Sequence, residues 1–494
     1  MAAMLHDGAV ELDPAGFDAA VARAAGLPLQ DAGRAVALLA DNGIDWLVAA
    51  AGVARAGGVL IPLPGFFTDT QCRHVLGATG AALLLTDDPA RGLRLGFAAS
   101  GGLPGTGLHC LHADTGAAVT PGLLPEGTGL VTFTSGTTGA PRGVCLGAGA
   151  LARVADAVAS VARALGVERH LCLLPLGVLL EQVAGAGAAS LAGATAFVPP
   201  LATVGMAGSS AFDARRALAQ VSRHEVHSLI LLPQMLQAMV AAVEGGAPRP
   251  ASLRIAAVGG GRVPPALVER ARALGIPACE GYGLSECGSV VALALPQDAP
   301  GSGMRPLPHA RVHTAPAPSP AARSESGADT QPIGDEVVVE GPAFLGYLGG
   351  PAHASGAPVR TGDLGTLDAA GALRITGRLK HLIITGFGRN VSPEWPESEL
   401  LAQPQVQQAV VFGEARPWLC AVLVPAPGAD LASLAAAVAA ANAGLPDYAR
   451  IGGWVVAPTP FTPADGTLTA NGRPRREVVH ARHGAQLDAL YPRC

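Results

Sequence analysis

Short apolar runs and longer amphipathic stretches alternate along the first half of the chain. Each apolar run is long enough for one buried strand, and the runs lie at 35–39, 58–63, 81–85, 170–174 and 227–232. The stretches between them carry apolar residues at helical spacing and predict helices at 44–54, 71–78, 151–165, 180–192 and 214–224. Strands that alternate with helices in this way predict a mostly parallel α/β sheet.

The pattern changes after a Pro-rich connection at 313–331. Two antiparallel strands are expected at 336–340 and 372–375, and a small α+β unit follows. Its helices and strands are predicted at 398–403, 406–412, 419–424, 431–441 and 453–457. Because 494 residues exceed one typical hydrophobic core, we expect two domains, at 1–377 and 381–494, with the boundary at 378–380.

Charge and cysteine content exclude several classes of protein. The 33 basic and 38 acidic side chains give a net charge of −5, which argues against a nucleic-acid partner. The 8 cysteines include no Cys-x-x-Cys pair, so neither a zinc site nor a disulfide framework is predicted, and a reducing, cytoplasmic location is expected. The first residues lack a signal-peptide pattern, and glycine and proline interrupt the apolar stretches. We therefore expect no membrane span, which leaves only peripheral membrane association open.

A loop rich in hydroxyl groups and glycine carries the strongest chemical signal. Residues 132–144 read Thr-Phe-Thr-Ser-Gly-Thr-Thr-Gly-Ala-Pro-Arg-Gly-Val and contain five hydroxyl side chains, three glycines and one arginine. Backbone N–H groups in such a turn form an anion-binding nest, which fits a polyphosphate. The Walker P-loop is excluded, because Gly136 and Gly139 are too close together and Arg142 is followed by Gly143.

The segment 135–143 resembles the phosphate-loop signature of the AMP-forming adenylating enzymes, which include acyl-CoA synthetases, peptide-synthetase adenylation domains and luciferases. The family usually has lysine at the position of Arg142. The resemblance implies an α/β fold with a large N-terminal domain of layered α/β subdomains plus a small barrel-like part, followed by a small mobile α+β C-terminal domain. It implies that ATP contacts Thr134, Ser135, Gly136, Thr137, Thr138, Gly139 and Arg142.

A second motif at 280–286 reads Glu-Gly-Tyr-Gly-Leu-Ser-Glu. By itself this segment fits either a tight turn with a buried tyrosine or a site where the ring lies flat against a planar ligand. It resembles the family's Tyr-Gly-x-Thr-Glu motif, with serine in place of threonine. On that resemblance Tyr282, with its flanking Gly281 and Gly283, contacts adenine. Ser285 is catalytic and contacts phosphate, and Glu286 is catalytic and binds Mg²⁺.

Two turns complete the expected nucleotide site. Residues 258–264 follow a strand but lack the glycine spacing of a dinucleotide fold. In the family the equivalent turn, which contains Gly260 here, lines the acyl and adenine pockets. Residues 361–365 read by themselves as a capped turn. By resemblance Asp363 accepts hydrogen bonds from ribose, which suits a carboxylate because it is acceptor-only when ionised.

Residues 377–394 resemble the family's interdomain linker and the loop after it, although by themselves they also fit a basic strand with a glycine turn on an exposed edge. On the resemblance Arg378 contacts ribose or phosphate and Lys380 is the hinge. Gly386 and Gly388 would border a tunnel for the acceptor thiol. Lys380 is the only lysine in the chain, which indicates a bias in codon usage.

The segment 468–476 resembles the loop that carries the family's catalytic lysine, and the lysine position falls on Arg473. A cation there would bridge the incoming carboxylate and the ATP phosphates. Arginine keeps the charge but is larger and planar, so the exchange is not conservative by default. A pseudoenzyme would lose this lysine, whereas a chain with almost no lysine would drift to arginine. Arg142 shows the same exchange and favours drift.

The resemblance, carried by several motifs in order along the chain, implies a reaction in two steps. A carboxylate attacks the α-phosphate of ATP and pyrophosphate leaves; the thiol of CoA, or of a carrier protein's phosphopantetheine, then attacks the acyl-adenylate and AMP leaves. Residues 171–212 contain no aspartate for the ammonium group of an amino acid, so an apolar acyl group is expected, as in fatty acyl-CoA synthetases. A ligase that loads an acyl carrier protein and a nucleotide-binding pseudoenzyme are the alternatives.

Overall fold

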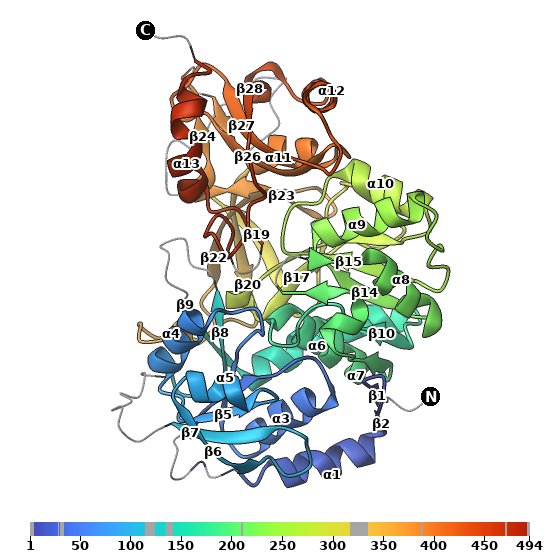
Figure 1. Cartoon of the computed structure of the whole chain (residues 1–494), viewed down its shortest axis with the longest axis vertical. Helices are drawn as coiled ribbons and strands as arrows, with labels where there is room; N and C mark the ends of the chain where they lie inside the picture. The colour runs from blue at the N-terminus through green and yellow to red at the C-terminus, as the bar shows by residue number, and fades with distance from the viewer. Residues whose placement is uncertain are drawn as a thin grey trace.

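The computed structural model describes residues 4–27, 29, 34–113, 124–134, 142–208, 211–316, 334–386, 389–469 and 472–491. Two large sheets with their helices form the lower and right-hand body of the molecule in Figure 1, and the C-terminal residues form a smaller part at the top. In the described ranges, no helix combines the length and the apolar character that a membrane crossing needs.

The first large sheet is built on short strands that are buried on both faces. Strands β3 (Ala35–Leu39), β4 (Val59–Pro62) and β5 (Leu83–Thr86) run parallel, and every residue in them is buried. Burial on both faces explains why these segments are continuously apolar rather than alternating. The sheet order is β21-β9-β8-β4-β3-β5-β7-β6, with β6 at Phe97–Gly102, β7 at His109–Ala113, β8 at Thr128–Thr134, β9 at Arg142–Gly147 and β21 at Gly346–Tyr347.

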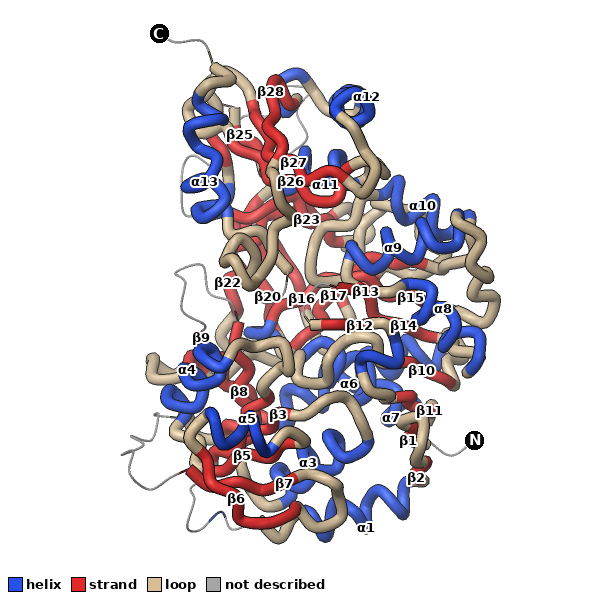
Figure 2. The backbone as a smooth tube through the Cα atoms, in the orientation of Figure 1, coloured by secondary structure: helices blue, strands red, loops and turns tan. Residues whose placement is uncertain are grey.

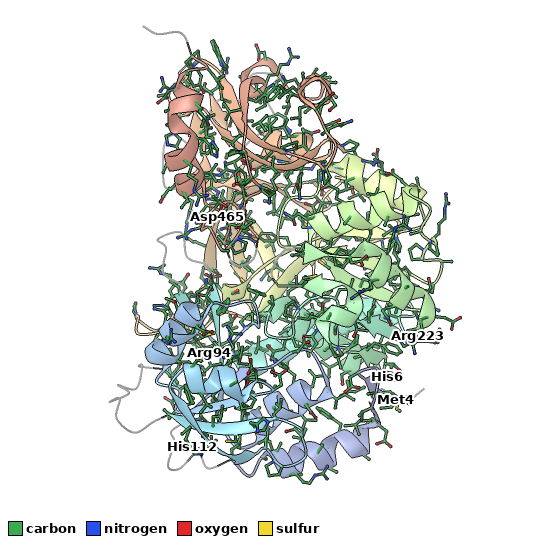
Figure 3. The ribbon with its side chains drawn as sticks, viewed as in Figure 1. Met4, His6, Arg94, His112, Arg223 and Asp465 are labelled. Atoms are coloured by element: carbon green, nitrogen blue, oxygen red, sulfur yellow. The ribbon has the colours of Figure 1, made fainter. Side chains whose placement is uncertain are left out.

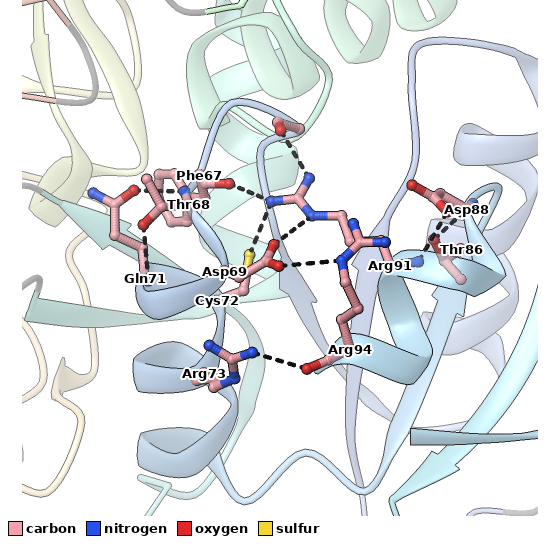
Figure 4. Close-up of polar contacts among 11 residues, drawn as sticks. Phe67, Thr68, Asp69, Gln71, Cys72, Arg73, Thr86, Asp88, Arg91 and Arg94 are labelled. Atoms are coloured by element: carbon pink, nitrogen blue, oxygen red, sulfur yellow. Dashed lines mark hydrogen bonds and ion pairs between the residues drawn. The ribbon is translucent and has the colours of Figure 1, made fainter. Parts of the chain in front are cut away.

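Hydrogen bonds from Arg91 fix a loop next to the first large sheet. The helices here are α1 (Pro14–Ala24), α3 (Ile44–Arg55), α4 (Asp69–Thr79) and α5 (Pro89–Arg94). Arg91 donates from Nε to Asp69 at 3.0 Å, from one terminal nitrogen to the Gly65 carbonyl at 2.9 Å, and from the other to the Phe67 carbonyl (Figure 4). These bonds hold α5 against the start of α4 and fix the loop that carries Phe66 and Phe67.

The second large sheet has nine strands and supports the site. Its order is β18-β17-β16-β15-β14-β10-β11-β1-β2, with β1 at Leu5–His6, β2 at Glu11–Leu12, β10 at Arg169–Leu171, β11 at Thr195–Phe197, β14 at Ser228–Leu231, β15 at Ile255–Val258, β16 at Ala278–Leu284, β17 at Ser289–Leu293 and β18 at Arg305–Pro306. One face packs against α6 (Ala148–Ala164). The other face packs against α8 (Ala214–Arg223), α9 (Pro233–Glu244) and α10 (Pro265–Ala273) (Figure 1). A short hairpin, β12 (Met206–Ala207) with β13 (Ala211–Phe212), follows the turn η2 (Leu201–Val204).

A buried carboxylate shapes the connection between β10 and β11. The predicted helix at 180–192 begins as a π-helix, η1 (Glu181–Gly187), and continues as α7 (Ala188–Ala192). Glu181 is fully buried; its Oε2 accepts the Leu174 N–H at 2.9 Å, and its Oε1 lies 2.9 Å from His170 Nε2. A Cβ atom on Gly185 would lie 2.0 Å from Glu181 Oε1, so only glycine fits beside this carboxylate.

An antiparallel sheet leads into the C-terminal part. Its order is β19 (Arg311–Ala315), β20 (Asp335–Glu340), β22 (Val359–Leu367) and β23 (Leu373–Arg378), and β23 continues into the turn η5 (Leu379–His381) (Figure 2). The C-terminal part contains β24 (Ile383–Ile384), β25 (Asn390–Val391), α11 (Glu394–Leu401), β26 (Val406–Phe412), β27 (Leu419–Pro425), α12 (Leu431–Ala443), η6 (Asp447–Ala449), β28 (Ile451–Val456) and α13 (Arg476–Asp488).

The predicted α/β fold is confirmed. The strands predicted at 35–39 and 406–412 begin and end at the predicted residues. The helix predicted at 398–403 begins earlier, at Glu394, because Pro393 and Pro396 fit its first turn. An antiparallel sheet of four strands, formed between Arg311 and Arg378, precedes the C-terminal part.

We expect Gly185→Ala to destabilise the fold by about 1–3 kcal/mol, because the added methyl group overlaps a buried carboxylate that is held by two hydrogen-bonding partners. Gly149→Ala in α6 is the matched control, since nothing lies within 4 Å of its added Cβ. In that control the free energy of unfolding should rise by about 1 kcal/mol at most. Urea unfolding measures both effects, and a Gly185→Ala variant as stable as the wild type would contradict the packing around Glu181.

Candidate active site

A large cavity lies where the second sheet, the antiparallel sheet and the C-terminal part meet. Its volume is about 480 Å³, which is in the range of ligand pockets in enzymes. One end is lined by charged and polar side chains and the other end by apolar ones. The lining includes the predicted site residues Arg142, Gly260, Gly281, Tyr282, Gly283, Ser285, Glu286, Arg378, Lys380 and Arg473.

A buried carboxylate joins three elements at the polar end. Asp363 in β22 is 4% exposed; its Oδ2 accepts the Tyr282 hydroxyl at 2.8 Å and its Oδ1 accepts Arg378 Nε at 2.5 Å. Burial, and then the charge of Asp363, raise the pKa of Tyr282 well above its usual value, so the phenol keeps the proton that it donates. The two bonds fix the Tyr282 ring at the cavity wall, and the remaining lone pairs of the carboxylate can accept from a ligand hydroxyl.

The glycines around Tyr282 have different roles. The pairing of β16 with β17 is irregular between Tyr282 and Gly283, and a Cβ atom on Gly283 would lie 2.0 Å from the Ser289 carbonyl oxygen. A Cβ atom on Gly281 would meet its nearest neighbour at an ordinary 3.4 Å. Gly283 is therefore required by the approach of the neighbouring strand, a reason that the sequence did not reveal.

Tyr347 belongs to the site, although sequence reasoning missed it. Its hydroxyl donates to Glu286 Oε1 at 2.8 Å, and the Arg142 guanidinium lies over its ring, 5.0 Å from the ring centre. Burial, and then Glu286, raise the pKa of Tyr347 to about 12, which keeps its hydroxyl protonated. Tyr347 thus connects two predicted phosphate- and metal-site residues through a hydrogen bond and a cation–π contact.

The central residues of the predicted phosphate loop, Ser135, Gly136, Thr137, Thr138 and Gly139, lie outside the described residues. The two ends of this loop are described. Thr134 ends β8 and Arg142 begins β9, and the two are paired across the hairpin. Arg142 lines the cavity, so the start of β9 reaches its polar end.

A narrow loop of the C-terminal part brings Arg473 to the cavity. Leu468 pairs with Pro474 across the loop, so Arg473 lies near its tip. Asp465 holds the base, because it accepts the Thr467 N–H at 3.0 Å and pairs with Arg482 of α13 at 2.7 Å. Figure 3 places Asp465 at the edge of the C-terminal part that faces the N-terminal sheets. Across that boundary Arg473 Nε donates to the Gly260 carbonyl at 3.0 Å.

The predicted hinge and tunnel residues are separated in the structure. Lys380 lies in η5 and lines the cavity next to Arg378. Gly386 does not line the cavity; its N–H donates to the Arg416 carbonyl at 2.7 Å, within the C-terminal part. Gly388 lies outside the described residues. The structure therefore brings the nucleotide-site predictions together but leaves Gly386 apart from them.

The far end of the cavity is apolar. It runs between α6 and the second sheet, where Val161, Leu165, Ile230 and Ile255 line it. Among the described lining residues, Glu286 is the only acidic side chain. Apart from Glu286, the described lining therefore offers no acidic side chain to a substrate ammonium group.

Comparison with known proteins matches both parts of the chain. Residues 17–316 match the family model for the AMP-binding enzyme, and residues 380–494 match its C-terminal domain. Indoleacetate–CoA ligase of Aromatoleum aromaticum is 30% identical over 63% of this chain and 60% of its own length. Feruloyl-CoA synthase of an Amycolatopsis species is 30% identical over 81% of this chain and 80% of its own length.

A solved structure shows the same fold over nearly the whole chain. O-succinylbenzoate CoA synthetase from Bacillus subtilis, in complex with AMP, superimposes with a TM-score of 0.71 at 23% identity. The alignment covers 96% of this chain and 94% of that one. With both family models matched in order along the sequence, the chain belongs to the AMP-binding enzyme family.

Proposed function

We propose that this chain is an ATP-dependent acid–CoA ligase. A substrate carboxylate oxygen attacks the α-phosphorus of ATP, the bond to the β-phosphate oxygen breaks, and pyrophosphate leaves. The CoA sulfur then attacks the acyl carbonyl, the bond to the phosphate oxygen breaks, and AMP leaves while the thiol proton passes to solvent. The observation that carries the proposal is the single cavity lined by Arg142, Tyr282, Glu286, Arg378 and Arg473, with Asp363 bonded to Tyr282 and Arg378.

The nucleotide would occupy the polar end of this cavity. Tyr282 would stack on adenine with its ring held by Asp363, and Asp363 would accept from the ribose hydroxyls. Arg378, whose guanidinium already pairs with Asp363, would contact ribose or phosphate. Ser285 and the loop from Thr134 to Arg142 would donate to the phosphates. Such positioning and charge neutralisation is the main contribution that a protein makes to phosphoryl and adenylyl transfer.

Glu286 fits the role of a magnesium ligand. Its Oε1 accepts the Tyr347 hydroxyl, and its Oε2 takes part in no described hydrogen bond. A carboxylate oxygen next to substrate phosphates is the kind of ligand that Mg²⁺ prefers, and the bound ion would neutralise part of the phosphate charge. Tyr347 would orient this carboxylate and, through its ring, the Arg142 guanidinium.

Arg473 would replace the family's lysine. Only its Nε is engaged in the described contacts of its side chain, on Gly260, so its two terminal nitrogens are available to the substrate carboxylate and the α-phosphate. Guanidinium binds such oxygen pairs in a fixed fork. This geometry favours an active enzyme over a pseudoenzyme.

The second half-reaction would require the C-terminal part to move. Residues 378–380 would act as the hinge between 1–377 and 381–494. Rotation there would withdraw Arg473 and bring Gly386 and Gly388 to the cavity as the border of a thiol tunnel. Domain closure of this kind separates two half-reactions in one site.

The acyl substrate would be an apolar acid that fills the far end of the cavity. A medium- or long-chain fatty acid is the first candidate, supported by the apolar lining from α6 and the second sheet. The names of the relatives, an indoleacetate ligase and a feruloyl-CoA synthase, make an apolar aromatic acid the second candidate.

Release of AMP and pyrophosphate from ATP, with and without CoA, tests this function. Fatty, aromatic and amino acids are compared, and we expect turnover with apolar acids that CoA accelerates. If the acyl group is transferred to a carrier protein and CoA has no effect, the acceptor in the proposal changes from CoA to the carrier protein. Absence of turnover with every class of acid would contradict a ligase and favour a nucleotide-binding pseudoenzyme.

Arg473→Ala should lower adenylate formation by about 100-fold, because a charged donor to the developing transition state is lost. Thiolysis of preformed acyl-adenylate should fall far less, since Arg473 is assigned to the first step only. Arg473→Lys is the matched control and should retain most adenylate formation. The two half-reactions are measured separately by pyrophosphate release and acyl-CoA formation, and equal losses in both would refute the assignment.

Tyr347→Phe should lower kcat/KM for ATP by about ten-fold and raise the Mg²⁺ concentration needed for half-maximal rate. The variant keeps the ring under Arg142 but removes the hydrogen bond to Glu286, and a bond to a charged group is worth about 1.5–3 kcal/mol. Tyr491→Phe is the control, because that hydroxyl donates to the Trp418 carbonyl within the C-terminal part. Identical kinetics for both variants would exclude the orienting role of Tyr347.

A further inference from the structure

Two polar side chains line the far end of the cavity, where the surroundings are apolar. His170 in β10 and Ser228 in β14 are paired in register, so they share one face of the sheet. His170 Nδ1 lies 2.9 Å from Ser228 Oγ, and His170 Nε2 lies 2.9 Å from Glu181 Oε1. Both residues contribute to the cavity lining and are almost fully buried, at 3% and 8% exposure. A polar group in such a place needs a hydrogen-bonding role.

These residues lie at a defined distance from the nucleotide end. Ser228 begins β14, and Leu231, which ends it, pairs with Val258 just before the turn that contains Gly260. Three residue steps along a strand span about 10 Å. Ser228 is therefore placed to meet the distal end of an acyl group whose carboxylate lies near Arg473 and Gly260.

The Ser228 hydroxyl has hydrogen-bonding capacity left over. The Glu181 carboxylate is an acceptor, so it selects the His170 form that carries a proton on Nε2. In the neutral ring Nδ1 then accepts the Ser228 proton, and both lone pairs of Ser228 Oγ remain. If the ring is protonated on both nitrogens, Ser228 accepts from Nδ1 and its own O–H is free. In each case the described contacts leave Ser228 Oγ able to form one more hydrogen bond.

Two other roles for this cluster fail on chemistry. The order Glu181, His170, Ser228 is that of a hydrolytic triad, but the acyl carbonyl would react about 10 Å away, near the nucleotide. Cys172 lies close enough to Glu181 and His170 to suggest a metal site. However, the ligand atoms are already paired, Glu181 with His170 and the Leu174 N–H, and His170 with Ser228, so a metal ion would have to break these hydrogen bonds.

We propose that Ser228, positioned by His170 and Glu181, binds a hydroxyl group at the distal end of the acyl substrate. The substrate class is then an apolar acid with a terminal hydroxyl, on a chain or a ring, at least about 10 Å from the carboxylate, because β14 alone spans that distance between Ser228 and Leu231. A hydroxyl fits both protonation states of His170, because it can donate or accept. This inference rests on the proposed ligase function and adds the specificity of its acyl pocket.

Matched acid pairs test the proposal in the wild-type enzyme. Octanoate is compared with its terminal hydroxy derivative, and cinnamate with its para-hydroxy derivative, by kcat/KM for pyrophosphate release. We expect a preference of roughly ten-fold for the hydroxy acid that fits the pocket, with most of the difference in KM, because one hydrogen bond is gained in ground state and transition state alike. Equal values within both pairs overturn the inference but leave the ligase function standing, whereas no release with any acid contradicts the ligase itself.

Ser228→Ala should abolish this preference while the variant still turns over the parent acids. Ile230→Val is the matched control, since Ile230 lies two residues along the same strand and lines the same cavity. It should change kcat/KM for both members of a pair by the same factor. A hydroxy-acid preference that survives in Ser228→Ala would assign the recognition to another group and overturn the proposal.

Discussion

The carboxylate of Asp363 is the interaction on which the arrangement of the site depends. It lies in the antiparallel sheet and receives one hydrogen bond from the second large sheet, through Tyr282, and one from Arg378, the last residue of β23. A buried carboxylate is costly unless it is paired and hydrogen-bonded, and these two donors satisfy it. Arg378 lies directly opposite Asp363 in the same antiparallel sheet, whereas Tyr282 comes from the second large sheet, so the bond from Tyr282 also fixes the position of one sheet against the other.

Three arginines and one lysine line the described part of this cavity. Arg142 stacks on Tyr347, and Arg473 reaches Gly260 across the boundary between the two matched family regions. Both contacts use features that lysine lacks. Arg142 places a planar guanidinium on the Tyr347 ring, and Arg473 donates from Nε to Gly260 while its two terminal nitrogens remain for other partners. The exchange of lysine for arginine therefore preserves charge and also changes how each cation is held. This supports drift under a lysine-poor composition with retained function.

Local sequence predicted the elements that depend on local causes. The uniformly apolar run of β3 and the largely apolar segment of β26 predicted strands, and the Tyr-Gly and linker motifs predicted described residues that line the polar end. Tyr347 was not predictable, because its bond to Glu286 joins residues 61 positions apart and depends on the pairing of β21 with β9. Likewise, Ser228 and His170 carry no motif, and they become neighbours only when β10 and β14 pair in register.

The central claim is that this cavity joins an acid to AMP. Its most direct test is mass spectrometry of the small molecules retained by the wild-type protein after incubation with ATP, Mg²⁺ and an apolar acid, with no thiol present. The account predicts a bound acyl-adenylate whose mass changes with the acid supplied, together with free pyrophosphate. Retention of unchanged ATP, with no acyl-adenylate for any acid, would contradict it.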